Sequence, residues 1–481
     1  MDILKKQARK APPKKGSMHE MMLIAIPMVI SQGCYTIMTF TDRMFLSRLG
    51  PEYMNAAMGG GLTVFMMLTF FLGLTGYATV LVAQYLGSSN EKHCSLVITQ
   101  SVIIVILAYP IILLCRPLAH RLFDFMGIMP QQLRLQKLYF NILLSAAILS
   151  LLRTCFSSFF SGIGKTRVVM FSAFTAMVVN ICVNYLLIFG RFGFPALGIR
   201  GAAYGTIIGA GCGLLVLLAS YLKRENLETY GILKSFRIDF PVIRTLLRFG
   251  YPAGLEMFLN LLAFDIIIMI FHSMGAIAAT ASTIVFNWDM VSFVPLIGIE
   301  IAVSSLVGRY MGSGSPDTAH RATMSGLKLG LIYSSLVMLL FIIFPLNMVE
   351  VFHPAAAEGI FTHAKPIAVF MIRIAAIYVL VEAMLVIFIG ALRGAGDTFW
   401  AMLISVSLHW LIVPVLYVMM KIMGLSLETC WSAVITIFFV FSFVVYLRYR
   451  TGHWRKIKVI QLPIPSAAAV IYDDFHEPSD L

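Results

Sequence analysis

The sequence predicts an all-α polytopic membrane protein, with twelve transmembrane helices arranged as two pseudo-symmetric six-helix lobes. Three observations lead to this fold class: the apolar composition, the spacing of the apolar runs and an internal repeat. Of the 481 residues, 59% are hydrophobic and only 12% are charged, about half the charged share of a soluble protein. A chain this apolar cannot cover itself with polar side chains, so much of its surface must face lipid.

The apolar runs set the number of helices. One bilayer crossing takes about 20 apolar residues, so a chain of this length has room for about a dozen crossings. The first run is too long for a signal-peptide core, so we expect it to be a retained anchor. The twelve runs fall at approximately residues 20–47, 54–84, 93–118, 137–160, 168–190, 200–222, 248–273, 280–308, 323–349, 366–392, 398–421 and 427–447.

Basic residues indicate how the chain is oriented. The net charge is +13, and Lys and Arg gather before the first run, after the last run and between the halves. Lys-rich and Arg-rich segments stay in the cytoplasm, so both termini are expected there, with the spans in the cell inner (plasma) membrane. The expected parts are a basic cytoplasmic arm at 1–17, a first lobe at 18–222, a cytoplasmic linker at 223–247, a second lobe at 248–449 and a largely disordered cytoplasmic tail at 450–481.

The two halves look like copies of one another. Short motifs recur at a nearly constant spacing, since 252 − 27 and 312 − 87 both equal 225, and 396 − 164 equals 232. The paired residues are Pro27 with Pro252, Gly87 with Gly312, and Gly164 with Gly396. Two units with an even number of helices share one orientation, so their axis runs along the membrane normal. Binding sites are then expected between the lobes, near the middle of the membrane.

Ionisable side chains inside the apolar runs are candidate functional residues, because each costs about 2.5–3.5 kcal/mol to place at mid-membrane. In the first lobe, Asp42 lies in the motif TFTDRMF. Asn180 and Asn184 are four residues apart and therefore share one helix face. We expect these three residues to form a polar cluster that binds a proton or substrate. The alternative is that Asp42 only anchors its helix through the adjoining Arg43.

The second lobe contains another candidate cluster. Glu256 follows Pro252 by four residues, while Tyr378 and Glu382 are four apart on one helix face. Carboxylate and hydroxyl oxygens can replace the hydration shell of a monovalent cation, and the same carboxylates could instead carry a proton. We therefore expect Glu256, Tyr378 and Glu382 to form one site for Na⁺ or H⁺. The alternative is a structural pairing of these acids with an arginine such as Arg373.

Five further charged residues lie within the apolar runs. Asp265 and Asp289 could line the same cavity and contact a cationic substrate, although structural pairing explains them equally well. The roles of Glu300, Arg153 and His409 stay open. The seven cysteines are scattered singly, so we expect them to be packing residues and neither disulfides nor metal ligands.

Several motifs together resemble the multidrug and toxin extrusion (MATE) family over residues 18–450. They include the prolines that open helices one and seven, TFTDRMF, GYPAGLE, NICVNYLLIFGRFGFPALGIRGAA and EAMLVIFIGALRGAGDT. Within the family, the chain resembles the bacterial NorM-like branch. That branch has acidic, tyrosine and asparagine residues that match six positions here: Asp42, Glu256, Glu382, Tyr378, Asn180 and Asn184.

The chain departs from the family pattern at four positions. Glu382 stands where the NorM-like branch usually has aspartate, which leaves the ion selectivity open. Asn184 stands where the archaeal and DNA-damage-inducible branch more often has aspartate, which argues against that branch. Asp289 and Glu300 make helix eight more acidic than the family pattern suggests, which points to an altered substrate.

The resemblance implies a cation-coupled antiporter, driven by Na⁺ or H⁺, that exports organic compounds by alternating access. Acidic side chains with abundant Met and Phe favour cationic amphipathic drugs or toxins as cargo. The expected partners are a small-molecule substrate, a monovalent cation and membrane lipid, with no cofactor and no nucleic acid, and the expected state is a monomer. One alternative is a lipid-linked oligosaccharide flippase of the same superfamily, which would need a basic cavity. A membrane enzyme is disfavoured because no DDxxD, HxxxxD-type or GxSxG motif lies at a membrane surface.

Overall fold

The protein is built from helices throughout residues 13–353 and 358–460, the ranges that its structure, a computed structural model, describes. The first lobe contains α2 (Met18–Ser47), α3 (Pro51–Gly76), α4 (Ala78–Gly87), α5 (Glu91–Leu114), α6 (Arg116–Phe125), α7 (Pro130–Ser145), α8 (Ile148–Gly162), α9 (Thr166–Phe189) and α10 (Ile199–Tyr221). The connector contains α11 (Arg224–Thr229) and the short turn η2 (Ile232–Lys234). The second lobe contains α12 (Phe240–His272), α13 (Ala276–Gly312), α14 (Pro316–Ile343), α15 (Pro345–Glu350), α16 (Glu358–Ala395), α17 (Thr398–Tyr417), η3 (Val418–Ile422), α18 (Leu427–Arg450) and η4 (His453–Lys456).

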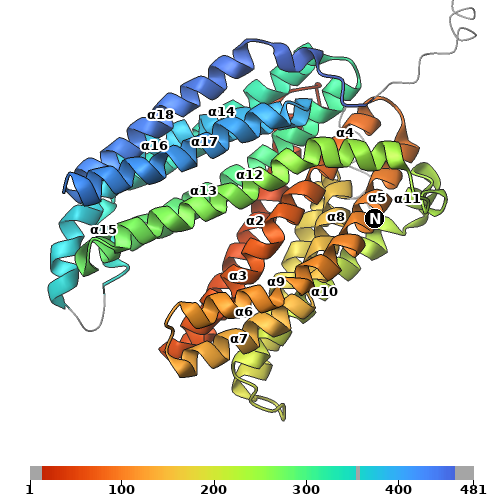
Figure 1. Cartoon of the computed structure of the whole chain (residues 1–481). Helices are drawn as coiled ribbons and strands as arrows, with labels where there is room; N and C mark the ends of the chain where they lie inside the picture. The colour runs from red at the N-terminus through yellow and green to blue at the C-terminus, as the bar shows by residue number, and fades with distance from the viewer. Residues whose placement is uncertain (1–12, 354–357, 461–481) are drawn as a thin grey trace, which may run out of the picture.

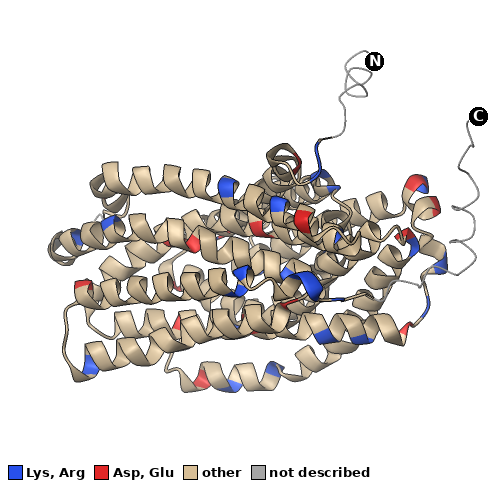
Figure 2. Cartoon of the chain, turned by 90° about the horizontal axis from the view of Figure 1, so that it is seen from above, with Lys and Arg blue, Asp and Glu red and all other residues tan. Residues whose placement is uncertain are grey.

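The helices form two bundles that meet at one end. Figure 1 shows the helices of the first half in one bundle and those of the second half in the other. The bundles converge around α4 and the end of α13, and they diverge toward α7 on one side and α15 on the other. Figure 2 shows that most of the helical surface carries no charged residue, as lipid contact requires.

The number of candidate spans agrees with the sequence. Within the described residues, eleven helical segments are long and apolar enough to cross a membrane, and the pair α7 and α8, bent by 45°, would make a twelfth. The predicted fold class, an all-α polytopic membrane protein of two six-helix lobes, is confirmed. Three expected spans are interrupted, however: 54–84 is divided between α3 and α4, 93–118 between α5 and α6, and 137–160 between α7 and α8.

The breaks have local causes where the sequence supplies one. Pro117 lies in the first turn of α6, where its missing N–H prevents α5 from continuing without interruption. At the bend between α7 and α8, Ala146 has a φ of −119°, outside the helical range. Gly76 precedes the break between α3 and α4, and nothing else in the structure explains that break.

The second lobe begins earlier than expected. We expected a linker at 223–247, but α12 starts at Phe240. The Asp239 side chain accepts a hydrogen bond from the Val242 N–H at 3.1 Å, and Pro241 occupies the first turn. A capping acid followed by proline is a standard start signal for a helix, so the sequence contained this information.

The tail was expected to be largely disordered, but its beginning, residues 451–460, is folded. Trp454 is 1% exposed, and its Nε1–H donates to the Tyr449 carbonyl at 2.9 Å. Val459 and Ile460 are buried in the same cluster as Val242 in α12. Apolar contacts therefore hold residues 451–460 in place, while 461–481 and the arm residues 1–12 lie outside the described part of the chain.

The described segments nearest the two chain ends lie on the same side of the protein. The Gly16 N–H donates to the Tyr310 hydroxyl at 3.1 Å, and the Gly16 carbonyl accepts from Ser325 at 2.8 Å. Near the other end of the chain, Arg455 pairs with Asp317 at 2.9 Å, at the start of α14. Both segments thus contact the same end of α14, as an even number of spans requires.

Glycines bring the two lobes into close contact where they converge. A Cβ added to Gly73 in α3 would lie 2.7 Å from the Gly254 Cα in α12. A Cβ added to Gly298 in α13 would likewise lie 2.7 Å from the Val29 Cα in α2. The two contacts are copies of one another, because 298 − 73 and 254 − 29 both equal 225. The internal repeat therefore extends to the interface between the lobes.

This contact predicts a position-specific effect of one methyl group. Gly73→Ala should destabilise the protein by about 1–3 kcal/mol, because the new methyl group overlaps the α12 backbone and forces the lobes apart. Gly76→Ala in the same helix is the matched control, since its Cβ would meet nothing within 4 Å. Thermal unfolding in detergent measures both variants. Equal melting temperatures for the two would contradict the close contact.

Candidate functional site

The first lobe holds a buried carboxylate in a network of amides and a hydroxyl. Asp42 in α2 is 9% exposed and accepts hydrogen bonds from the Asn184 amide and, at 3.3 Å, from the Thr206 hydroxyl. Asn184 also donates to Asn180 at 3.3 Å, and Asn180 donates to Thr206 at 3.4 Å. The structure therefore brings together the three predicted residues of this lobe. The fourth member, Thr206 in α10, was not predicted.

The geometry around Asp42 also bears on the alternative that it anchors its helix through Arg43. No ion pair joins Asp42 to Arg43 among the described residues, and the Arg43 side chain is exposed. If Asp42 takes up a proton on Oδ2, Asn184 can still donate to Oδ1, and the Thr206 hydroxyl can turn to accept from the new O–H. The arrangement can therefore hold a proton without a change of fold.

The second lobe holds Tyr378 and Glu382 side by side in α16. The Tyr378 hydroxyl donates to Glu382 Oε1 at 2.7 Å, as their spacing of four residues predicted. Glu382 is 4% exposed, and its second oxygen is buried without a hydrogen-bond partner in the described residues. Asp289 in α13 is near enough for its charge to act on both side chains. A buried carboxylate oxygen without a donor is a natural binding point for a cation or a proton.

Glu256 belongs to a different hydrogen-bonded group. Arg393 in α16 forms an ion pair with Glu256 Oε1 at 3.0 Å and donates a hydrogen bond to Glu300 in α13. When both carboxylates are ionised, the arginine neutralises one of them and the group has a formal charge of −1. Glu256 Oε2 is buried with no partner in the described part of the chain. This oxygen is a second candidate binding point.

A line of side chains connects the two groups of the second lobe. Asn260, one turn beyond Glu256 in α12, donates to the Ser405 hydroxyl at 2.7 Å. His409, one turn beyond Ser405 in α17, bonds the Ser405 carbonyl through Nδ1 at 2.9 Å. Its ring contacts Phe438, with 6.0 Å between centroids, and Phe438 contacts Tyr378 at 4.7 Å. A series of contacts through Asn260, Ser405, His409 and Phe438 therefore runs between the two carboxylate groups.

The expected single site of Glu256, Tyr378 and Glu382 is thus divided between two groups in this structure, and their joint binding of one cation stays a prediction. The sequence suggested Arg373 as an alternative partner of these acids, whereas Glu256 pairs with Arg393 and Glu382 forms no ion pair with a described residue. Arg393 lies in LRGAGDT, the end of one of the motifs that resemble the MATE family. The presence of an arginine at the end of an apolar run is the sequence signal that could have pointed to Arg393.

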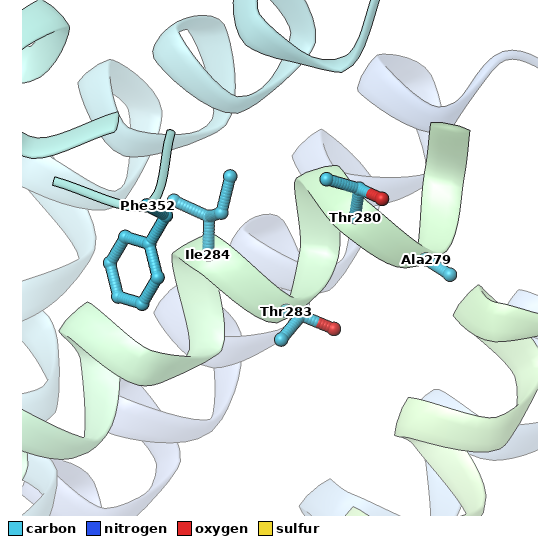
Figure 3. Close-up of a pocket in the computed structure, with 5 residues that line it drawn as sticks. All are labelled: Ala279, Thr280, Thr283, Ile284 and Phe352. Carbon is cyan, nitrogen blue, oxygen red and sulfur yellow. The ribbon is translucent and has the colours of Figure 1, made fainter. Parts of the chain in front are cut away.

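A separate shallow cavity of about 310 Å³ lies at the start of α13. Figure 3 shows the Phe352 ring beside Ile284, with Thr280 and Thr283 on the same helix. The cavity contains no acid, so the predicted cavity residues Asp265 and Asp289 do not line it. Both aspartates are half-buried and form no ion pair with another described residue.

Comparison with known proteins gives the family. The MatE family model matches residues 27–186 and 252–418, which make up more than half of the chain. The chain belongs to the MatE family. The two matches start 225 residues apart (252 − 27) and end 232 apart (418 − 186), the spacings of the internal repeat. The MatE assignment and the repeat therefore support each other.

Bacterial transporters are among the relatives of this MatE protein. It is 27% identical over 447 residues to a protein of Thermotoga maritima named probable multidrug resistance protein NorM, with 92% of this chain and 94% of the relative covered. It is 26% identical to the uncharacterized transporter YisQ of Bacillus subtilis, with 94% and 98% covered. These similarities confirm the MATE family and the NorM-like resemblance.

Solved structures give the same fold. A MOP superfamily transporter from Pyrococcus furiosus, described as having a binding pocket of reverse polarity, superimposes with a TM-score of 0.83 at 20% identity. A multidrug resistance MATE family transporter in an outward-facing conformation gives 0.83 at 20% identity. Each comparison covers 93% of this chain and 100% of the other. These structures show the fold, while the family model and the named relatives show that this MatE chain is a multi-pass membrane transporter rather than an enzyme.

The group around Arg393 predicts a large stability effect. Arg393→Met should destabilise the protein by about 3–5 kcal/mol, because the buried Glu256 and the partly buried Glu300 lose their shared counter-charge. Arg373→Met is the matched control, since Arg373 is exposed in the same helix. Denaturant unfolding in detergent compares the two. Replacing Glu256 and Glu300 by Gln in the Arg393→Met protein should recover most of the loss, and no recovery would contradict the pairing.

Proposed function

We propose that the protein exports organic drugs or toxins from the cell in exchange for Na⁺ or H⁺. The naming of its relatives as multidrug resistance proteins supports the cargo class. One observation supports coupling of export to a cation. Glu256 and Glu382 each have a buried carboxylate oxygen with no hydrogen-bond donor among the described residues. The protein would work as a monomer in the inner (plasma) membrane, with both termini in the cytoplasm.

The second lobe would bind the coupling cation. Glu382 offers one free oxygen beside the Tyr378 hydroxyl, and Glu256 offers another within a group that carries one excess negative charge. A cation at either point would neutralise charge that the low-dielectric interior penalises. One charge moving inward through about 100 mV supplies about 2.3 kcal/mol, enough for roughly fifty-fold accumulation of cargo. The choice between Na⁺ and H⁺ is open in this proposal.

The first lobe would hold the proton or the cargo. Asp42 is surrounded by Asn180, Asn184 and Thr206, each able to donate to a carboxylate or to turn toward a polar group of the cargo. A protonated Asp42 attracts a cationic cargo less than a charged one does. Protonation from outside would therefore release such a cargo.

Alternating access would use the glycine contacts between the lobes. If α2 begins in the cytoplasm, the end where Gly73 and Gly298 close the interface is the cytoplasmic end. The described arrangement would then be closed toward the cytoplasm and open outward. Cation binding must favour one arrangement over the other, because equal affinity for both would shift nothing.

Neutralising either free carboxylate should stop transport. Glu256→Gln and Glu382→Gln should each lower coupled dye efflux from cells by at least about tenfold, because the amide keeps the size but cannot hold the cation. Tyr378→Phe should weaken the ion dependence without eliminating transport, since only one oxygen of several is lost. Dye efflux and drug resistance measured at equal expression test all three variants.

The control is Glu428→Gln, in the first turn of α18 and away from both groups. This variant should transport as the wild type does. Near wild-type efflux in Glu256→Gln or Glu382→Gln would remove that residue from the proposed mechanism.

Asp42→Asn separates a transport role from a structural one. If Asp42 is the protonation switch of the first lobe, the asparagine should mimic the protonated state, so that cargo still binds but turnover stops. If Asp42 only fixes α2 to α9 and α10, efflux should persist while stability falls by about 1–3 kcal/mol, as for an orphaned buried partner. Binding, efflux and melting temperature measured on this one variant distinguish the two outcomes. Retained efflux with a lowered melting temperature would refute the switch.

A further inference from the structure

Arg309 lies in the last turn of α13, and one edge of its guanidinium group has no partner. Its Nε and Nη2 atoms are buried, and neither forms a hydrogen bond with a described residue. No ion pair joins Arg309 to an acid within residues 13–353 and 358–460. Buried donors of a charged group are costly to leave without an acceptor. This edge is therefore suited to bind an oxygen acceptor.

Arg448 shows what this edge of a guanidinium group binds. Its Nε and Nη2 donate to the two carboxylate oxygens of Asp397 at 2.8 Å and 3.0 Å. The two N–H groups are parallel, so together they fit two oxygens of one carboxylate or phosphate group. Arg309 presents the same pair of donors without an acid beside them. The ligand that this edge prefers is therefore an oxyanion.

The internal repeat shows that contact between the lobes does not require an arginine at this position. The counterpart of Arg309 in the first lobe is Gln84, since 309 − 84 equals 225. Gln84 is 2% exposed, and its amide donates to the Gly394 carbonyl of the other lobe at 3.1 Å. A neutral amide thus makes the contact in one copy, whereas the charged group of the other copy forms no such bond among the described residues. The charge of Arg309 therefore calls for a separate explanation.

The free edge of Arg309 lies against the first lobe. The end of α13 packs beside α4 and α8, where the lobes converge (Figure 1). Gly164, between α8 and α9, has a φ of +78°, and a Cβ added to it would lie 2.6 Å from Arg309 Nη2. A side chain at this position would displace the guanidinium group. Because Nη2 is the far end of a flexible side chain, the edge can turn to meet a ligand beside Gly164.

The first turn of α9 supplies further donors two residues after Gly164. Helix α9 begins at Thr166 without a side-chain cap, so the N–H groups of its first turn are free to bind an anion. Thr166 is 1% exposed, and its Oγ1 is buried with no hydrogen-bond partner in the described part of the chain. The positive end of the helix dipole adds to the charge of Arg309. A guanidinium group, a hydroxyl and a helix N-terminus therefore meet around Gly164.

The acids near this place leave Arg309 without a counter-charge. Lys165 donates to Glu225 at 2.8 Å, so that acid already has its own cation. Glu91, in the first turn of α5, is near enough to Cys94 for its charge to act there, as is Arg309, but Glu91 is exposed and forms no ion pair with the arginine. An exposed charge is screened by water and salt, so Glu91 opposes an anion here only weakly.

We propose that Arg309, Thr166 and the first turn of α9 form a binding site for a phosphate group, carried by inorganic phosphate or by a lipid headgroup. The ligand would accept from Arg309 in the second lobe and from the Thr166 hydroxyl and the helix N–H groups in the first. It would therefore join the lobes at the end of the protein where Gly16 contacts Tyr310, and favour the arrangement that is closed there. The site is separate from both acidic groups, so it goes beyond the export function and does not depend on it.

Thermal unfolding of the purified full-length protein in detergent tests the site. The melting temperature is measured in sodium phosphate and in sodium chloride at equal pH and ionic strength. The wild type should melt at a higher temperature in phosphate, with an effect that saturates. In Arg309→Gln the phosphate concentration at half-maximal stabilisation should rise at least about tenfold, as expected for loss of charged hydrogen bonds. Arg309→Lys should fall between the two, because it keeps the charge without the planar fork.

The variants also separate a ligand site from a structural role. Arg309→Gln should fold, because Gln84 occupies the equivalent position of the other copy, and in chloride it should melt no lower than the wild type. Thr166→Val keeps the shape without the hydroxyl and should weaken phosphate binding severalfold. The control is Arg321→Gln, an exposed arginine in α14, which should keep the full response. Equal phosphate responses of the wild type and Arg309→Gln would show that phosphate acts through the solvent, and would overturn the site.

Nanodiscs distinguish the two sources of the phosphate group. In discs of phosphatidylcholine, the wild type should respond to inorganic phosphate as it does in detergent. If that response persists in discs of phosphatidylglycerol, free phosphate is the ligand. If phosphatidylglycerol removes the response and raises the melting temperature of the wild type above that of Arg309→Gln, the anionic headgroup is the ligand. If neither phosphate nor phosphatidylglycerol separates the wild type from Arg309→Gln, the proposed site is wrong.

Discussion

The free-energy cost of placing charge in a low-dielectric interior constrains how the side chains of this protein are arranged. Each charge within the spans must be paired, hydrogen-bonded or given a ligand, because an isolated one costs several kcal/mol. Glu256 and Glu300 share Arg393 as their counter-charge. Arg448 donates to Asp397 at 2.8 Å and 3.0 Å. Asp42 accepts hydrogen bonds from neutral donors. Charges that remain incompletely satisfied are then the places where an ion or a cargo would bind.

The two lobes use the same fold but different chemistry. The interface glycines obey the repeat, with Gly73 against Gly254 in one copy and Val29 against Gly298 in the other. The charged group does not, since the counterparts of Glu256 and Arg393 in the first lobe are Ser31 and Ser161, at spacings of 225 and 232. Under the proposed function, this difference in charge between two similar lobes would let the second lobe bind a cation while the first lobe binds cargo.

Composition and periodicity were enough to predict the fold class, because lipid contact requires long apolar helices that show plainly in the sequence. Spacing within one helix was equally informative, as the hydrogen bond from Tyr378 to Glu382 confirms. Contacts between helices were not predictable in this way. Nothing local shows that Arg393 reaches Glu256 across 137 residues (393 − 256), or that Thr206 completes the Asp42 network. Such pairings depend on how the helices pack against one another. The spacing of apolar residues along a single sequence does not reveal this packing.

The central claim is that an inward ion gradient drives cargo outward through this protein. Its most direct test is dye efflux by purified wild-type protein in proteoliposomes, with a Na⁺ gradient or a pH gradient imposed one at a time. The account predicts that one of these gradients moves dye against its own concentration gradient, and that collapsing it with an ionophore stops the uphill movement. Dye that moves only down its own gradient, at the same rate with and without either ion gradient, would contradict the account.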